Sequence, residues 1–258
     1  MKLLILCMSC NLPYHNKQEN IVKETWGKNI LMNKYDNVSL YFYKAGVEEK
    51  IEGNCIYVNT GDDWYNTYPK TLRALQLLEE NNIEYDFILR TNCSTYVNID
   101  MLFYFIDFVI KKQYTSHIFT GELLRTDLKI NNDTIEHVTI GRGNFLLFNK
   151  FHIHMILNFK YNDYLITHNT DDRIFGKVFE YNNIIPIKYT AVYENHEYKL
   201  RTEPMSCSDM FVSYRYFFNE DRFYYESAGA KKIDDFFLNN KVTEDDFHKL
   251  LLFSHIPE

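Results

Sequence analysis

The chain has 258 residues, of which 46% are hydrophobic and 24% charged, and its formal net charge is -7 at pH 7. This composition is typical of a globular protein and excludes a disordered one, and the length fits one large α/β domain better than two. The acidic balance argues against a broad nucleic-acid-binding surface, because such a surface needs clustered lysine and arginine.

The cysteines and the apolar start of the chain bear on its compartment. The odd number of cysteines and their irregular spacing predict reduced thiols (Cys7, Cys10, Cys55, Cys93, Cys207). Cys7 and Cys10 form a CxxC pair, but a redox pair is expected at a helix N-terminus and this one ends a predicted strand. The apolar run Leu3–Met8 is shorter than a signal peptide requires, and no stretch has the length of a membrane span. We therefore expect a cytoplasmic protein without a membrane span.

The first part of the chain alternates short apolar strands with helices. Strands are predicted from β-branched and aromatic runs, and helices from apolar residues at helical spacing. The predicted strands are Leu3–Met8, Val38–Tyr43, Cys55–Asn59 and Tyr85–Arg90, and the predicted helices are Glu19–Asn29, Lys70–Glu80 and Ile99–Lys111. Strands separated by helices predict a mostly parallel sheet that is covered on both faces.

The pattern is less regular in the second part of the chain. The regular alternation ends after His117–Gly121, and a glycine turn then precedes an apolar strand within Thr139–Phe148. The remaining predictions are helices, at Asn149–Phe159, within Thr167–Tyr181, at Lys231–Asn239 and at Thr243–Phe253. No linker, repeat or flexible hinge divides the sequence, so we expect a single domain with C-terminal helices.

Polar residues gather where ligands bind in open α/β sheets, which is beyond the carboxyl ends of the strands. The loops after Met8, after Arg90 and around Asp171 are therefore the first places to expect a site. After Arg90, the short side chains of Asn92 and Ser94 could face a pyrophosphate, although the same residues would suit a helix-capping loop.

Two further segments carry possible chemistry. In Gly141–Gly143 the glycines would let the backbone approach a ligand closely, or would simply make a tight turn. Asp171 and Asp172 precede a predicted helix, where a carboxylate could take the proton from an attacking hydroxyl. Capping of the helix and a favourable interaction with its dipole explain the same pair without catalysis.

Taken in order, these segments resemble the β-1,3-galactosyltransferase and Fringe-like glycosyltransferases, a GT-A fold family. Val22–Gly27 (VKETWG) is similar to the family's I-R-x-T-W-G stretch, and Asp62–Thr71 (DDWYNTYPKT) to its D-x-Y-x-N-L-T-x-K-T stretch. Arg90–Asn98 resembles the K-x-D-D-D-x-F-V-N stretch. The glycine turn, together with Asp171–Gly176, resembles the family's glycine turn and its E/D-D-x-x-x-G element.

The resemblance implies a GT-A-like, mostly parallel twisted sheet flanked by helices. It divides the chain into a nucleotide-sugar-binding half (1–110), an acceptor and catalytic half (111–200) and a C-terminal helical extension (201–258). It also implies an inverting transfer of a sugar, UDP-linked in the family, to an acceptor hydroxyl on a glycan. Asp172 would be the general base and Asp171 would position the sugar or the acceptor.

The chain departs from the family at the metal site. The acidic triad falls on Asn92, Cys93 and Ser94, which leaves no carboxylate for Mn²⁺ or Mg²⁺, and hard cations prefer charged oxygen ligands. The family's early basic pair falls on Gln18 and Glu19. A metal-free transferase would have to neutralise the departing diphosphate with its own cations. The donor-binding residues that we expect are Arg90, Asn92, Ser94, Lys70, Asp62, Cys10, Arg142 and Gly143, with Arg215 and Arg222 as further phosphate or acceptor contacts.

Three other interpretations of the sequence remain open at this stage. The fold could be a sugar- or nucleotide-binding module that lost catalysis together with its acidic triad. It could be a glycosyltransferase acting on modified DNA bases, which the acidic balance disfavours. The chain could also be an unrelated α/β protein in which the motif matches are accidental.

Overall fold

The computed structural model describes residues 1–121, 123–141, 143–160, 163–184 and 186–188, the backbone of 192–195 and 213–216, and residues 231, 233–235, 237, 239 and 243. The helices in these ranges are α1 (Pro13–Glu24), α2 (Lys28–Leu31), α3 (Thr67–Glu80), α4 (Ile99–Lys111), α5 (Lys150–Asn158), α6 (Asp163–His168) and α7 (Asp171–Tyr181), with short 3₁₀ turns η1 (Trp64–Asn66) and η2 (Tyr114–Ser116).

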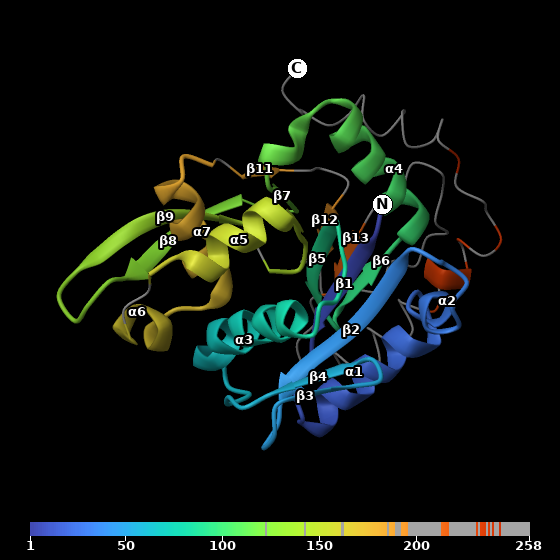
Figure 1. Cartoon of the computed structure of the whole chain (residues 1–258), viewed down its shortest axis with the longest axis horizontal. Coiled ribbons are helices and arrows are strands. Elements are labelled where there is room, and N and C mark those ends of the chain that lie inside the picture. The colour runs from blue at the N-terminus through green and yellow to red at the C-terminus, as the bar shows by residue number, and fades with distance from the viewer. Residues whose placement is uncertain are drawn as a thin grey trace.

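The main sheet has eight strands in the order β11-β7-β10-β5-β1-β2-β4-β3 (Figure 1). Their bounds are β1 (Leu3–Met8), β2 (Val38–Ala45), β3 (Lys50–Glu52), β4 (Cys55–Val58), β5 (Phe87–Asn92), β7 (Phe119–Thr120), β10 (Leu146–Asn149) and β11 (Ile187–Lys188). The central strands β5, β1, β2 and β4 are parallel, and β3 and β10 run antiparallel to their neighbours. The prediction of a mostly parallel α/β sheet is confirmed.

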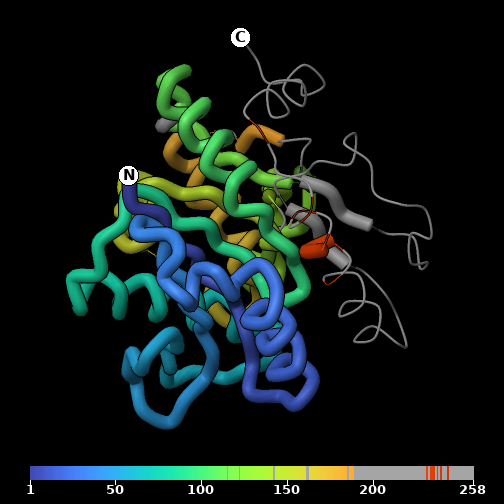
Figure 2. Tube along the Cα trace, turned by 90° about the vertical axis from the view of Figure 1, so that its right-hand side faces the viewer, coloured from blue at the N-terminus to red at the C-terminus, as the bar shows by residue number. Residues whose placement is uncertain are grey.

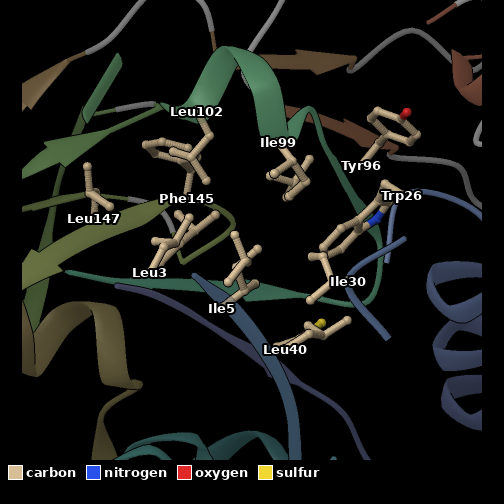
Figure 3. Packing of buried hydrophobic residues seen from close by; sticks show 14 of the residues in the cluster. Leu3, Ile5, Trp26, Ile30, Leu40, Tyr96, Ile99, Leu102, Phe145 and Leu147 are labelled. Carbon is tan, nitrogen blue, oxygen red and sulfur yellow. The ribbon is translucent and has the colours of Figure 1, made fainter. Parts of the chain in front are cut away.

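Helices cover both faces of this sheet because alternate side chains of each strand point to opposite sides. Leu3 and Ile5 of β1 join a cluster with residues from α1, α2 and α4. Figure 3 shows these two side chains with Ile30 of α2 and Ile99 of α4. Leu4 and Leu6 face the other way, into a cluster with residues from α3, α5 and α7. Figure 2 follows the chain from the side, with α4 in green and the α1–α2 segment in blue.

Two smaller sheets flank the main one. Strands β8 (Leu123–Lys129) and β9 (Ile135–Gly141) form an antiparallel hairpin that extends away from the main sheet and has α6 beside it (Figure 1). In the other small sheet, β13 (Ser213–Tyr216) pairs with both β12 (Val192–Asn195) and β6 (Thr95–Val97). None of the helices in the described ranges combines the length and the apolar character that crossing a bilayer requires.

Two predicted helices are each divided in the structure. The helix expected at Glu19–Asn29 is α1 followed by α2, because the chain turns at Gly27, where a Cβ would lie 2.8 Å from the carbonyl oxygen of Val22. The segment Thr167–Tyr181 contains the end of α6 and the whole of α7. Asn169 separates these helices by hydrogen bonding to the backbone of Lys129 on β8. Of the C-terminal helices, the described residues between 231 and 239 are helical, and 244–253 lie outside the described residues.

Candidate functional site

The topology of the sheet locates the site before any side chain is considered. From β1 the chain passes through α1 to β2 on one side, and it later returns through α3 to β5 on the other side of β1. Ligands of open α/β sheets bind at such a reversal of strand order, beyond the carboxyl ends of the strands. In this protein those ends are Met8 and Asn92, which are partners in the register of β1 and β5. Two of the three predicted loops, after Met8 and after Arg90, therefore lie together.

Helix α1 begins directly beyond the end of β1. Its N-cap residue, Leu12, makes no side-chain capping bond, Pro13 occupies the start of the helix, and the first turn contains no acidic residue. A helix N-terminus carries a partial positive charge and backbone N–H groups that suit an anion. The sequence prediction missed this feature because it placed the start of the helix at Glu19. The Pro13 signal for a helix start was present in the sequence.

Lys70 of α3 joins the loop after β1 to the loop after β4. Its side chain is fully buried, and Nζ donates to the Ser9 carbonyl at 3.1 Å and to the Asp62 carboxylate at 3.0 Å. Asp62 also accepts hydrogen bonds from the backbone N–H groups of Asn11 and Ala45. Burial would raise the pKa of Asp62, but these bonds and Lys70 outweigh it and lower the pKa. Cys10 lies in the same group, with its sulfur 3.5 Å from Nζ.

A second buried ion pair joins Arg90 of β5 to Asp171 at the start of α7. The side chains are 2% and 4% exposed, and the guanidinium Nη2 donates to Asp171 Oδ2 at 2.5 Å. Nη1 donates to the carbonyl of Gly143. Burial alone would lower the pKa of Arg90, but the Asp171 carboxylate outweighs it and raises the pKa. Both Nη atoms are thus hydrogen bonded to protein groups, the buried Nε has no such partner in the described part of the chain, and the expected contact with a diphosphate stays a prediction.

Both carboxylate oxygens of Asp171 accept hydrogen bonds from other protein groups. Its Oδ2 also accepts from the Thr71 hydroxyl at 3.0 Å, and its Oδ1 accepts from the backbone N–H of Asp172 at 3.0 Å. Thr71 follows Lys70 directly on α3, so these two neighbouring residues connect the two ion pairs. Thr71 was not among the predicted site residues, although a Lys-Thr pair inside an apolar helix was a signal that could have indicated it.

Asp172 has a different environment from its neighbour. The residue is partly exposed, and its Oδ1 accepts hydrogen bonds from the Thr170 hydroxyl and from the backbone N–H of Arg173. Its Oδ2 has no hydrogen-bond partner within the described ranges. Burial raises the pKa of Asp172, and the adjacent Asp171 charge raises it further. A carboxylate with an uncommitted oxygen and a raised pKa has the properties of a general base.

Glycines allow the close contacts that hold this arrangement. A Cβ on Gly176 of α7 would lie 2.6 Å from the Thr139 carbonyl of β9, so only glycine lets the helix pack this closely on the hairpin. A Cβ on Gly143 would lie 2.3 Å from Nη1 of Arg90. Close packing therefore requires glycine at both positions, and the two sequence interpretations of the turn, a close approach to a ligand or a tight turn, stay predictions.

Asn92 and Ser94 form a local turn at the end of β5. The Asn92 Oδ1 accepts from the hydroxyls of Ser94 at 2.8 Å and Thr95 at 2.9 Å. Cys93 is 7% exposed, and its sulfur lies 3.6 Å from that of Cys7. These are the positions of the family's acidic triad, and their oxygen atoms are neutral. Within the described ranges, no three histidine, cysteine, aspartate or glutamate side chains are grouped so as to hold a metal ion.

The side chains of three arginines that we expected to bind the donor or the acceptor fall outside the described part of the chain. Arg142 and Arg222 fall outside the described residues, and only the backbone of Arg215 is described, in β13 opposite Thr95 of β6.

Another buried polar group, around Glu19, was not among the predicted site residues. Glu19 is 4% exposed and accepts hydrogen bonds from the Ser9 hydroxyl at 2.9 Å and from the Lys44 ammonium at 3.1 Å. These bonds fix the loop after β1 to helix α1.

Comparison with known proteins adds little to this picture. No protein-family model matches the chain, and no curated protein matches it. Among solved structures, the chain is similar to S. aureus TarS with 12% sequence identity and a TM-score of 0.41, over 97% of this chain and 42% of that one. The chain thus spans less than half the length of that structure. A similarity of this degree leaves the function to be argued from the residues themselves.

Proposed function

We propose that this chain is an inverting glycosyltransferase that moves a sugar from a nucleotide-diphosphate sugar, UDP-linked, to a hydroxyl of a glycan acceptor. The observation that carries the proposal is the difference in environment between two adjacent carboxylates. Asp171 is buried against Arg90, whereas Asp172 is partly exposed, has a raised pKa and keeps one oxygen uncommitted. The motifs that resemble Fringe-like glycosyltransferases support the same assignment.

The residues account for a single-displacement reaction. Asp172 takes the proton from the acceptor hydroxyl through Oδ2 as the hydroxyl oxygen attacks the anomeric carbon. The bond from that carbon to the diphosphate oxygen breaks on the opposite side, and its electron pair leaves with the diphosphate. Arg90 and Asp171 serve as positioning residues, because they fix the first turn of α7 without facing solvent.

The departing diphosphate needs positive partners in this scheme. We assign this role to the N-terminus of α1, whose N-cap residue Leu12 makes no side-chain capping bond and which lies beyond the end of β1, near the Lys70–Asp62 pair. The residues at the triad positions do not fit Mn²⁺ or Mg²⁺, since the Asn92 oxygen is taken by two hydroxyls and the Cys93 thiol is buried beside Cys7. The proposal therefore includes no step through a metal ion.

The test combines donor binding with turnover. Purified protein is screened by thermal shift against UDP-, GDP- and dTDP-sugars, with EDTA and with Mn²⁺, because a ligand that binds the folded state raises the melting temperature. Donor hydrolysis and transfer are then compared between the wild type, Asp172→Asn and the control Asp107→Asn. Asp107 is an exposed aspartate of α4, on the other face of the sheet.

We expect a UDP-sugar to stabilise the protein in EDTA, and Asp172→Asn to bind that donor while turning over roughly 10²- to 10⁴-fold more slowly. Asp107→Asn should behave as the wild type. In the wild type, turnover should fall with decreasing pH at a higher pH than an ordinary aspartate would give, because the base must be ionised. Donor binding without hydrolysis or transfer in the wild type would instead identify a binding module, and no binding of any nucleotide-sugar would refute the proposal.

A further inference from the structure

An exposed aromatic pair lies on a turn that is hydrogen bonded, through one threonine, to the start of α7, where the two carboxylates stand. Trp64 and Tyr65 are the first two residues of the short 3₁₀ turn η1 between β4 and α3, and they are 71% and 59% exposed. Large aromatic side chains are usually at least partly covered, so two adjacent exposed ones mark a surface that meets a partner. The question is which partner the surroundings of this pair favour.

The turn that carries the pair is held rigidly. Asp63 caps it by accepting from the N–H groups of Tyr65 at 2.9 Å and Asn66 at 3.2 Å, and the Asn66 amide donates back to Asp63 at 2.6 Å. A Cβ on Gly61 would lie 2.6 Å from that amide, so the loop closes tightly on itself. Aromatic side chains on a preorganised turn lose little conformational freedom when a ligand binds.

The same turn is tied to the start of α7 through one hydroxyl. Thr67 Oγ1 donates to the carbonyl of Trp64 at 3.1 Å and accepts from the backbone N–H of Asp171 at 3.3 Å. The aromatic turn and the acidic pair are thus only two hydrogen bonds apart. Helix α6 also contacts η1, and it presents Tyr164 stacked on His168, with ring centroids 3.9 Å apart, immediately before the acidic segment.

We propose that Trp64 and Tyr65 form a stacking platform for a sugar ring of the acceptor glycan, beside the general base. This inference rests on the proposed function. A sugar ring has an apolar C–H face that packs on the electron-rich face of an aromatic ring, and it carries hydroxyls on the same ring. Such a ligand offers a partner to each of two groups: the exposed aromatic side chains of η1, and the open oxygen of Asp172 on the segment that Thr67 ties to this turn.

The chain offers an internal reporter for this test, because it has two tryptophans. Trp26 is 5% exposed and its indole donates to the Thr95 carbonyl, whereas Trp64 is exposed. Quenching of the intrinsic fluorescence by acrylamide should therefore come from Trp64, and the Trp64→Phe variant identifies this component. Ligands to be tested are tetrasaccharides of β-linked glucose, of β-linked N-acetylglucosamine and of α-linked glucose, together with UDP alone and a glycan array.

We expect a glycan to protect Trp64 from acrylamide, and Trp64→Ala to weaken its binding roughly threefold to tenfold. The matched control is Tyr181→Ala, which removes an aromatic side chain that is 73% exposed at the far end of α7. With an active donor, the ratio of transfer to donor hydrolysis should fall in Trp64→Ala and not in Tyr181→Ala.

The outcomes separate this inference from the proposed function. Glycan protection of Trp64 without donor turnover would support the platform and refute the transferase. Donor hydrolysis by the wild type, with glycan binding equally affected by Trp64→Ala and Tyr181→Ala, would overturn the platform alone. Protection by UDP and by no glycan would assign the pair to the donor nucleotide and overturn the inference, as would the absence of any protection.

Discussion

Replacing one buried carboxylate by its amide tests the roles assigned to the acidic pair. In Asp171→Asn the side chain keeps its size but loses its charge, so the Arg90 guanidinium, which is 2% exposed, remains buried without a counter-charge. Breaking a buried ion pair by removing one partner costs about 3–5 kcal/mol. For a domain of this size each kcal/mol lowers the melting temperature by about 2–4 °C, so the expected loss is roughly 6–20 °C.

The neighbouring substitution should have the opposite character. The pKa of Asp172 is raised in the folded state, which means that folding disfavours its ionised form and that this residue costs stability at neutral pH. Asp172→Asn removes that cost and can keep the hydrogen bonds at Oδ1. Its stability should therefore stay within about 1 kcal/mol of the wild type, or rise, while its turnover falls roughly 10²- to 10⁴-fold.

The measurement is urea unfolding at pH 7, followed by the fluorescence of the buried Trp26 in a Trp64→Phe background. A double variant, Arg90→Met with Asp171→Leu, separates the effect of an unpaired charge from loss of packing. Replacement of a buried ion pair by apolar residues of similar volume is often neutral, so the double variant should recover most of the lost stability. Equal losses in Asp171→Asn and Asp172→Asn, or a double variant as unstable as Asp171→Asn, would refute the reasoning.

Two further predictions concern His152 on α5 and Gly143 beside Arg90. His152 is 1% exposed, and burial lowers its pKa from 6.5 to about 4. Because the folded state favours the neutral imidazole, the stability that this residue contributes is complete above pH 6.5. As the pH falls to 4, the free energy of unfolding should decrease by about 3 kcal/mol on account of this residue. The difference in unfolding free energy between wild type and His152→Gln, measured from pH 7 to 4, should change by that amount; a constant difference would contradict it. Gly143→Ala places a Cβ 2.3 Å from Arg90 Nη1 and should cost about 1–3 kcal/mol together with activity, whereas an Ala variant with wild-type stability and turnover would show that the turn can move away.

The sequence predicted the sheet better than the helix boundaries. Strand β1 and helix α4 have the predicted bounds, because each is a continuous apolar or amphipathic run that ends at a clear signal. The helix expected at Glu19–Asn29 was wrong at both ends. Its true start, Pro13, precedes a polar stretch in which Gln18 and Glu19 are buried, and burial of polar residues gives no apolar periodicity to read.

The short strands were missed for a related reason. Strands β3, β6 and β11 have two or three residues each, which is too short for an alternating pattern to be recognised. Their pairing depends on distant segments: β6, for example, pairs with β13, which is more than a hundred residues further along the chain.

The site shows the same limit of local sequence. Asp171 and Asp172 are identical residues at consecutive positions, and both suit the first turn of a helix. Successive side chains on a helix point about 100° apart, so only one of the two can face the sheet. Which one does is decided by Arg90, on a strand 81 residues earlier, and by Gly176, which sets how closely α7 packs on β9.

The requirement of Arg90 for a counter-charge explains why this arginine, which we expected to contact the diphosphate, is paired with Asp171 instead. A buried arginine requires a carboxylate partner, since an unpaired charge inside the protein would be too costly. With Arg90 and Lys70 neutralised by Asp171 and Asp62, our proposal assigns the diphosphate to the N-terminus of α1. Donor affinity should then change little when the Arg90–Asp171 pair is made uncharged. It should change strongly when the loop after β1 is altered, because the hydrogen bond between Ser9 and Glu19 holds that loop in place.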